Sequence, residues 1–479
     1  MEQFDLIVIG SGAGFMVIEE ALKQGKKCAL VENGKFGGTC LTKGCIPSKM
    51  LVYPADFIRE MERSERFGIK TTKPEFDWDV ISRRMWEQID LNKLIEKNLE
   101  QVPNLTLLKG TGSFEGPGSI RIQFEGNQPE QLIQGEKIVI GTGARSRVPV
   151  INGLEEAGYL TSETFFGEKY PEKPWKSLVI LGTGAISVEF AHIFSAFGTK
   201  ITLIGRSNRI LTKEDEEISD FVKKQFVQSG IDVLTDTTVL SVSKNHHLKY
   251  VTVENQVTKE IFEIECEEIL AASGSESTGD VLCLDQAGVE TDENGWIVTN
   301  QYLETSQKNI WALGDINGKY QFRHKANHEA QILAHNLYKV GTIKEARYHA
   351  VPWAIFTHPQ VAHVGMTEKE LKNRGISHVS AKNHYSEVVG GRAMGYRDGD
   401  EDNGFVKMIV GENKKILGVH IVGPQAATLL QPFVYIMNQE DPDSLAGTYE
   451  IVGDSMVIHP SLSELTAWVF EKIEWMEKK

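Results

Sequence analysis

The sequence predicts an α/β protein in which one Rossmann-like, dinucleotide-binding domain is inserted into another, followed by an α+β domain. The first observation is a pattern that occurs twice, at residues 4–14 and 177–187, where an apolar run leads into Gly-x-Gly. The second is a change of character after residue 345, where short strand-like segments are followed by helical ones.

The composition is that of an ordinary globular protein and argues against two functional classes. The chain has 479 residues, of which 41% are hydrophobic and 24% charged, and this length predicts two to four domains. A net charge of −15 argues against a nucleic-acid partner. No apolar run approaches the roughly 18 residues of a membrane span, and the first residues lack the basic start of a signal peptide. We therefore expect a cytoplasmic protein without a membrane partner.

The first repeat predicts a dinucleotide site. Gly10 would form the tight turn after the strand, Gly12 would let backbone amides approach a pyrophosphate, and Gly14 completes the motif. Glu32 ends the next apolar strand, 20 residues past Gly12, where a carboxylate can bind ribose hydroxyls. One Gly-x-Gly alone can be a simple turn between strand and helix, but two copies in this context favour nucleotide binding.

The second repeat, with Gly182 and Gly184, lacks the acidic partner. Gly205 stands at the position that corresponds to Glu32, and Arg206 and Arg209 follow it. A missing carboxylate and nearby guanidinium groups suit the 2′-phosphate of NADPH better than they suit NADH. The alternative is that both arginines are ordinary solvated charges, and NADH then remains possible.

Two dinucleotide sites in one chain suggest a flavoprotein that also binds a nicotinamide. A strand that runs into a glycine turn lies on each side of the second repeat, one with Thr142 and Gly143, the other with Asp315. Both would complete the first domain, where Asp315 could approach a ribitol hydroxyl. The predicted boundaries are 1–150 and 276–345 for the FAD domain, 151–275 for the inserted NAD(P) domain and 346–479 for the C-terminal domain.

A close cysteine pair lies near the start of the chain, within the first part of the predicted FAD domain. Cys40 and Cys45 have four residues between them, in the stretch GGTCLTKGCIPSKM. A cytoplasmic pair of this kind is more often catalytic or metal-binding than structural. Zinc would need further ligands, and Cys28, Cys266 and Cys283 show no paired spacing. No metal site is predicted.

The cysteine stretch, the two glycine motifs, Gly314-Asp315 and the C-terminal HPSLSEL at 459–465 together resemble the class I pyridine nucleotide–disulfide oxidoreductases, over essentially the whole chain. The resemblance implies an FAD-dependent homodimer whose Cys40 and Cys45 form a redox-active disulfide on the first turns of one helix. It also implies that Cys45 becomes the thiolate in contact with the flavin, while Cys40 attacks the substrate disulfide.

The same resemblance implies roles for four other side chains. His459 would act as acid and base, oriented by Glu464, and would serve the other subunit of the dimer. Lys49 and Glu189 match a pair near flavin N5, and we expect an ion pair there. The remaining cofactor-binding candidates, added to those named above, are Gly38, Thr39 and Gly274.

The substrate is the least determined feature. The segments FRHKANHEAQ, GAISVEFAHIF and GPQAATLLQPF look most like mycothione reductases and their relatives. The site at Gly205 and Arg206 favours NADPH, and hence a reductase of a small disulfide. Dihydrolipoamide dehydrogenase, which oxidises dihydrolipoyl groups with NAD+, is the alternative, because it shares every catalytic residue. A flavoprotein subunit without turnover is a third interpretation, disfavoured because both cysteines, His459 and Glu464 are intact.

Overall fold

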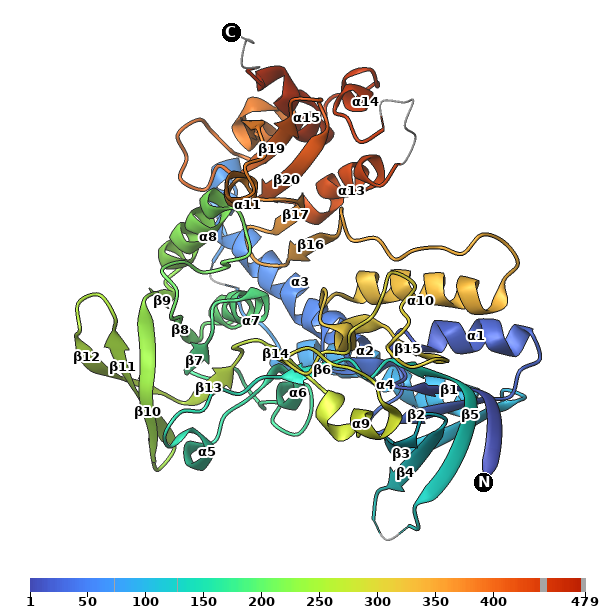
Figure 1. The fold of residues 1–479 in the computed structure, drawn as a ribbon. Coiled ribbons are helices and arrows are strands. Elements are labelled where there is room, and N and C mark those ends of the chain that lie inside the picture. Colours follow the sequence, from blue (N-terminus) through green and yellow to red (C-terminus); the bar gives the residue numbers. More distant parts are fainter. Residues whose placement is uncertain (73, 127, 440–445, 475–479) are drawn as a thin grey trace.

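The computed structural model describes residues 1–72, 74–126, 128–439 and 446–474. Three sheet-containing parts surround a central region crossed by the long helix α3, and the C-terminal part lies at the top of Figure 1. Two short pieces of the predicted C-terminal domain, 440–445 and 475–479, lie outside the described residues. Within the described ranges, no helix combines the length and the apolar character that a membrane crossing requires.

The first part is built on a parallel sheet of order β3-β2-β1-β5-β15, and β4 joins β3 to β5 in antiparallel pairing. Leu6 and Val8 of the central strand pack into one apolar cluster, and Ile7 and Ile9 into another, so both faces of the sheet are covered. The strands are β1 (Glu2–Ile9), β2 (Cys28–Glu32), β3 (Leu105–Gly116), β4 (Ser119–Phe124), β5 (Gln131–Ile140) and β15 (Ile310–Ala312).

The chain leaves this sheet after β5 and returns to it at β15. Trp311 pairs with Val139 in parallel register, although the whole second part lies between them in the sequence. The outgoing and returning segments also pair with each other, as the antiparallel strands β6 (Ala144–Ser146) and β14 (Ser275–Ser277). These pairings confirm the predicted insertion of one Rossmann-like unit into another.

The inserted part repeats the architecture on a smaller scale. Its parallel sheet has the order β13-β7-β8-β9, and a separate antiparallel sheet has the order β10-β11-β12. The parallel strands are β7 (Ser177–Leu181), β8 (Lys200–Ile204), β9 (Asp232–Leu234) and β13 (Glu268–Ala271). The others are β10 (Thr237–Asn245), β11 (Leu248–Asn255) and β12 (Ile261–Cys266).

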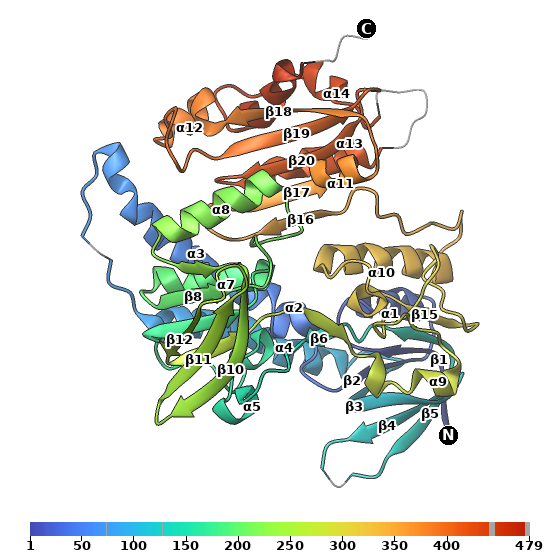
Figure 2. The same ribbon diagram turned by 60° about the vertical axis from the view of Figure 1, so that its left-hand side comes forward.

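The C-terminal part is an antiparallel sheet of order β16-β17-β20-β19-β18 with short helices beside it, which confirms the predicted α+β class. Figure 2 shows helix α8 of the inserted part lying against this sheet, near β16 and β17. The strands are β16 (Pro352–Ile355), β17 (Val361–Gly365), β18 (His378–His384), β19 (Phe405–Gly411) and β20 (Ile416–Val422).

The helices bury their apolar faces against these sheets and against each other. Helix α3 packs on α4 and on α7 of the inserted part, with Leu51, Met85 and Val188 fully buried in one shared cluster. The α-helices are α1 (Phe15–Lys23), α2 (Gly38–Thr42), α3 (Cys45–Glu62), α4 (Trp78–Leu99), α5 (Leu154–Ala157), α6 (Ser162–Phe165), α7 (Ala185–Ala196), α8 (Glu216–Gln228), α9 (Leu284–Ala287), α10 (Arg323–Tyr338), α11 (Glu368–Asn373), α12 (Val389–Ala393), α13 (Ala426–Met437), α14 (Glu450–Gly453) and α15 (Ser463–Ala467). Short 3₁₀ helices are η1 (Ser64–Phe67), η2 (Gly279–Val281), η3 (Gly314–Asn317), η4 (Tyr385–Glu387) and η5 (Trp468–Lys472).

Candidate active site

One continuous cavity of about 3380 Å³ joins the two glycine motifs. Its walls include the first glycine loop, the cysteine segment between α2 and α3, and the second glycine loop with the segment after β8. The carboxyl ends of the parallel strands open onto it, which is where ligands bind in folds of this kind. The arrangement therefore places both predicted nucleotide sites and the cysteine pair along a single path.

The first glycine loop leaves its backbone open to the cavity. Gly10 has φ of 100°, and a Cβ atom there would lie 2.3 Å from the carbonyl oxygen of Gly141. At Gly14 a Cβ would lie 2.7 Å from Val8 Cγ1, so the close approach of α1 to the strand requires glycine. A Cβ at Gly12, in contrast, would meet only the guanidinium of Arg323, at 3.7 Å. Such an uncovered loop before a helix fits a pyrophosphate.

Two carboxylates frame this end of the cavity. Glu32 Oε2 accepts hydrogen bonds from Ser11 N (2.8 Å) and Ser11 Oγ (2.6 Å), and Oε1 accepts one from Gly34 N (2.8 Å), which fix the side chain at the end of β2. The Asp315 carboxylate lines the cavity and accepts no hydrogen bond from the described residues, and burial raises its pKa to about 6. An acceptor of this kind fits a polyol hydroxyl, and the residues present therefore fit FAD.

The other candidates for this nucleotide line the same cavity. Thr142 and Gly143 line the cavity and are held by Thr278, whose hydroxyl is 2.9 Å from Thr142 Oγ1 and 3.1 Å from the Gly143 carbonyl oxygen. Gly38 and Thr39 begin α2 directly against the first loop, since a Cβ at Gly38 would lie 2.7 Å from the Cα of Gly12.

The expectation that one helix carries both cysteines is wrong. Cys40 lies inside the short helix α2, whereas Cys45 is the first residue of α3. The break is at Gly44, whose φ of −143° and ψ of −115° are not helical, and where a Cβ would lie 3.1 Å from the Thr39 carbonyl oxygen. The break places Cys45 at the N-terminus of an 18-residue helix, where the helix dipole favours a thiolate.

Both cysteines are free thiols in this structure, and their sulfurs interact. A hydrogen bond from the Cys45 thiol lowers the pKa of Cys40 to about 7, and the positive charges of Arg323 and Lys49 act in the same direction. The same hydrogen bond raises the pKa of Cys45. In the dithiol, Cys40 is therefore the more readily ionised thiol, and Cys45 is its hydrogen-bond donor.

Lys49 and Glu189 form the ion pair expected between α3 and α7. Lys49 Nζ lies 2.7 Å from Glu189 Oε2, and both residues line the cavity. The pair is held by the C-terminal part, because Phe356 N donates to Glu189 Oε1 (3.0 Å) and the Phe356 ring lies under Lys49 Nζ at 4.4 Å. Three parts of the chain thus meet beside the cysteines.

The second glycine loop also faces the cavity. Gly182 has φ of 125°, which puts its Cβ position 2.3 Å from the Ala272 carbonyl oxygen, and a Cβ at Gly184 would meet nothing within 4 Å. Gly274, with φ of 119°, lines the same cavity. The N-terminus of α7 follows Gly184, so its backbone amides can meet a phosphate.

The two arginines after β8 are not equivalent. Arg206 is exposed on the cavity wall and makes no ion pair with any described residue. Arg209 is engaged by α8, because its guanidinium lies 2.8 Å from Asp220 and 3.0 Å from Glu216. Gly205 has a steric reason to be glycine, since a Cβ there would lie 2.5 Å from Thr183 Cγ2. Arg206 is consequently the stronger of the two candidates for a 2′-phosphate.

His459 and Glu464 lie together but away from this cavity. His459 Nδ1 is 2.5 Å from Glu464 Oε1, the imidazole is 65% exposed, and the Glu464 side chain is 1% exposed. The backbone N–H of Ser461 donates to the second carboxylate oxygen (3.2 Å). Neither residue is among those that line the cavity of its own chain. The imidazole is thus presented outward by a buried carboxylate.

Helix α10 contributes residues that the motifs did not identify. Lys325 and Glu329 are buried, and both bind the backbone of Gly314. Lys325 Nζ donates to the Gly314 carbonyl oxygen (2.9 Å), and the Gly314 N–H donates to Glu329 Oε2 (2.7 Å). Arg323, at the start of the helix, lines the cavity and influences Cys40 as described above. The only sequence signals were the i, i+4 spacing of Lys325 and Glu329 and the position of FRHKANHEAQ shortly after Asp315.

Comparison with known proteins agrees with this geometry. A family model described as pyridine nucleotide-disulphide oxidoreductase matches residues 4–330. A second model, described as the dimerisation domain of pyridine nucleotide-disulphide oxidoreductases, matches residues 351–470. The two matches together span both nucleotide units and the C-terminal sheet.

Individual relatives extend over almost the whole chain. Mycothione reductase from Mycobacterium tuberculosis is 32% identical over 97% of this chain and 98% of its own. Dihydrolipoyl dehydrogenase from Chlamydia pneumoniae is 30% identical over 97% and 96%. Among solved structures, the Cu(II) complex of the HOCl-induced flavoprotein disulfide reductase RclA from Escherichia coli superimposes with a TM-score of 0.84 at 27% identity, covering 98% of this chain and 99% of that one.

Proposed function

Because the chain belongs to the pyridine nucleotide-disulphide oxidoreductase family, we propose that it reduces a small disulfide with electrons from NADPH, through Cys40 and Cys45. The chain is an oxidoreductase of a family that depends on FAD and uses NAD(P)H, and its dimerisation domain indicates a homodimer. The net reaction would convert NADPH, one proton and one disulfide into NADP+ and two thiols. The observation that carries the proposal is the cysteine pair in the wall of a cavity that joins two nucleotide-binding loops.

FAD supplies the two-electron link between the nicotinamide and the Cys40–Cys45 disulfide when it is bound. The protein groups beside the cysteines would assist by electrostatics. The ammonium of Lys49, held by Glu189, and the guanidinium of Arg323 add positive charge next to the sulfurs, where thiolates must form.

The lowered pKa of Cys40 supports its role as the attacking thiol. Its thiolate would attack one sulfur of the substrate, so that one thiolate leaves and a mixed disulfide with Cys40 remains. Cys45 would then lose its proton and attack the Cys40 sulfur, which releases the second thiolate and restores the internal disulfide. Each leaving thiolate needs a proton, and the structure offers an imidazole for it in His459.

The position of His459 supports a site shared between subunits. The imidazole is exposed, it is backed by the buried Glu464, and it lies within the region matched by the dimerisation model. We propose that His459 of the partner subunit closes the cavity beside Cys40. Glu464 would orient the ring through Nδ1, which leaves Nε2 to exchange the proton.

The choice of nicotinamide and of substrate class is supported by fewer contacts. Arg206 supports NADPH, and a reductase that keeps small thiols reduced fits a cytoplasmic location. A second candidate is a dihydrolipoyl dehydrogenase that uses NAD+. Two observations weaken the case for a strict NADPH enzyme and keep this candidate open: Arg209 is engaged by α8, and Gly205 is required by its contact with Thr183.

A two-by-two assay tests the proposal. The FAD-loaded enzyme is given NADH or NADPH with oxidised lipoamide or with a panel of low-molecular-weight disulfides, mycothiol disulfide included. We expect the highest kcat/KM for NADPH with one of the small disulfides. A higher kcat/KM with NADH and lipoamide would select the dehydrogenase, and absence of turnover with all pairs would contradict both.

A further inference from the structure

The inserted part meets the C-terminal sheet through a row of basic side chains. His363, His420 and Lys407 are direct cross-strand neighbours on β17, β20 and β19, and Lys382 of β18 continues the row. Residues paired in this way project from the same face of a sheet. Opposite them lies the acidic segment 214–217, which leads from the loop after β8 into α8.

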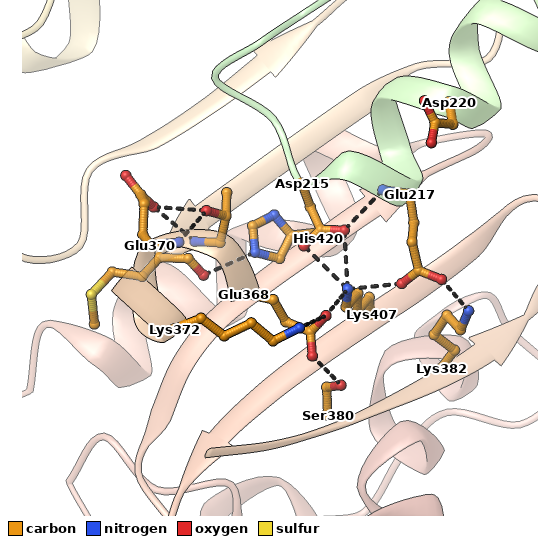
Figure 3. Close-up of polar contacts among 12 residues, drawn as sticks. Asp215, Glu217, Asp220, Glu368, Glu370, Lys372, Ser380, Lys382, Lys407 and His420 are labelled. Carbon is orange, nitrogen blue, oxygen red and sulfur yellow. Dashed lines mark hydrogen bonds and ion pairs between the residues drawn. The ribbon is translucent and has the colours of Figure 1, made fainter. Parts of the chain in front are cut away.

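At the end of this contact around Lys407, the buried charges are paired. Lys407 is 2% exposed, and its Nζ lies 3.0 Å from Asp215 Oδ1 and 2.8 Å from a carboxylate oxygen of Glu217 and of Glu368 (Figure 3). Lys382 pairs with the other oxygen of Glu217. Every buried charge here has an opposite charge beside it, as a stable buried ion pair requires.

The other end, around Glu214, is different. Glu214 is 6% exposed, one carboxylate oxygen accepts a hydrogen bond from His363 Nδ1 at 2.8 Å, and the other accepts one from Trp353 Nε1. Among the described residues, its only ion-pair partner within 4.0 Å is His363, which carries a positive charge only when it is protonated. A buried carboxylate without a cation is costly, because water is no longer there to solvate it.

His420 supplies a second, independent observation. It is completely buried, and its Nε2 lies 3.1 Å from the carbonyl oxygen of Met366, which fixes the proton on Nε2. Its Nδ1 is therefore a lone pair, and this buried atom has no hydrogen-bond partner in the described structure. In Figure 3 the ring lies beside Asp215 and the Lys407 end of the row. A neutral imidazole nitrogen with a free lone pair can bind a metal ion.

We propose that Glu214, His363 and His420 bind a divalent transition-metal ion of the zinc type, which ties the loop after β8 to the C-terminal sheet. The ligand atoms of the three residues lie within 4.8 Å of one another. Zinc binds imidazole nitrogen at about 2.0–2.1 Å and carboxylate oxygen at about 2.0–2.2 Å, so any two ligand atoms of a tetrahedral site stand about 3.4 Å apart. On binding, the three ligand atoms would draw in to that spacing, and a water molecule would take the fourth position.

The position of the site indicates how the ion would enter and which segment it would stabilise. Glu214 lines the large cavity, so a cation can enter from the nucleotide side. The loop that ends at Glu214 also carries Arg206 and Arg209. A bound ion would therefore fix the segment proposed to recognise the adenosine end of the nicotinamide, and this consequence alone rests on the proposed function. The ion itself is tested without turnover.

The test is metal retention by the FAD-loaded, untagged enzyme. The protein is kept oxidised, so that Cys40 and Cys45 are a disulfide and offer no thiolate, stripped with a chelator, equilibrated with Zn²⁺ and desalted. Elemental analysis should find one zinc per chain. His420→Gln and Glu214→Gln should lose it, whereas His192→Gln should keep it. His192 is the matched control, because it is 2% exposed and bonded to one carboxylate, Asp56, at 2.8 Å.

A measurement on the unaltered protein guards against variants that fail to fold. X-ray absorption of the zinc-loaded enzyme should show two imidazoles and oxygen, at about 2.0–2.2 Å, and no sulfur. The proposal is overturned if no zinc is retained, if folded His420→Gln and Glu214→Gln proteins keep it, or if sulfur is a ligand. Absence of retained zinc would leave Glu214 and His363 as a hydrogen-bonded contact between two domains.

Discussion

Replacement of Arg206 by alanine should lower kcat/KM for NADPH by roughly ten- to a hundred-fold and leave kcat/KM for NADH almost unchanged. A charge-assisted hydrogen bond is worth about 1.5–3 kcal/mol, and a tenfold change corresponds to about 1.4 kcal/mol. The side chain is exposed, so that solvent screens its charge, and we expect the lower end of the range. Arg209 cannot replace it, because Asp220 and Glu216 hold its guanidinium.

The assay is steady-state kinetics with each nicotinamide at a saturating disulfide concentration. Arg209→Ala is the matched control and should change kcat/KM for NADPH by no more than about fivefold, as for an exposed ion pair. A reversal of preference needs Gly205→Glu together with Thr183→Gly, since a Cβ at position 205 would otherwise lie 2.5 Å from Thr183 Cγ2. An equal loss with both nicotinamides in Arg206→Ala, or a wild-type preference for NADH, would refute the reasoning.

Three further outcomes follow from the geometry. Refolding a mixture of Cys40→Ala and His459→Ala chains should restore about a quarter of the wild-type activity, because half of the dimers then contain one complete shared site; no recovery in confirmed dimers would exclude a shared site. In the reduced, FAD-free chain, the rate of Cys40 alkylation should rise with pH around a midpoint near 7, since the thiolate is the nucleophile and the hydrogen bond from Cys45 lowers its pKa; a midpoint near the ordinary value of 9.0 would contradict the described contact. Lys407→Met should lower the free energy of unfolding in urea by about 3–5 kcal/mol, because Asp215 loses its buried partner, whereas the exposed Lys382→Met should cost less than about 1 kcal/mol; equal losses would show that burial of Lys407 does not matter.

The architecture could be predicted because its signals are local. An apolar strand followed by a glycine turn reads the same way at Gly10 and Gly182, and in both places a positive φ and a close carbonyl oxygen require the glycine. The segment around Asp315 has the same form, and it does return to the first sheet, with Trp311 paired to Val139. These features depend only on the order of residue types along a few turns of chain.

Features set by contacts across the fold were not predictable. The helix break between the two cysteines depends on Gly44 and its close approach to the carbonyl oxygen of Thr39. The prediction that Gly205 is an adaptation to NADPH did not include its contact with Thr183. The prediction that Arg209 binds the 2′-phosphate did not include its carboxylate partners on α8. In each case a contact that the order of residue types does not reveal decides what the residue does.

The cluster of Glu214, His363 and His420 shows most clearly how contacts across the fold escape prediction from sequence. His363 and His420 lie on different strands, and Glu214 lies in another part of the chain, so no sequence spacing connects them. Only the antiparallel register of β17 with β20, which sets His363 opposite His420, brings the two imidazoles together. For this reason the sequence predicted no metal site.

The most direct test of the central claim is the redox state of individual cysteines. The FAD-loaded, oxidised enzyme is treated with NADPH in the absence of oxygen and of any disulfide substrate, then alkylated, digested and analysed by mass spectrometry. We predict that Cys40 and Cys45 become alkylated only after NADPH is added, while the modification of Cys28, Cys266 and Cys283 does not depend on NADPH. If Cys40 and Cys45 stay linked after NADPH and, in a parallel sample, after NADH, or if they are modified to the same extent without a nicotinamide, the chain does not pass electrons through this pair and the account is wrong.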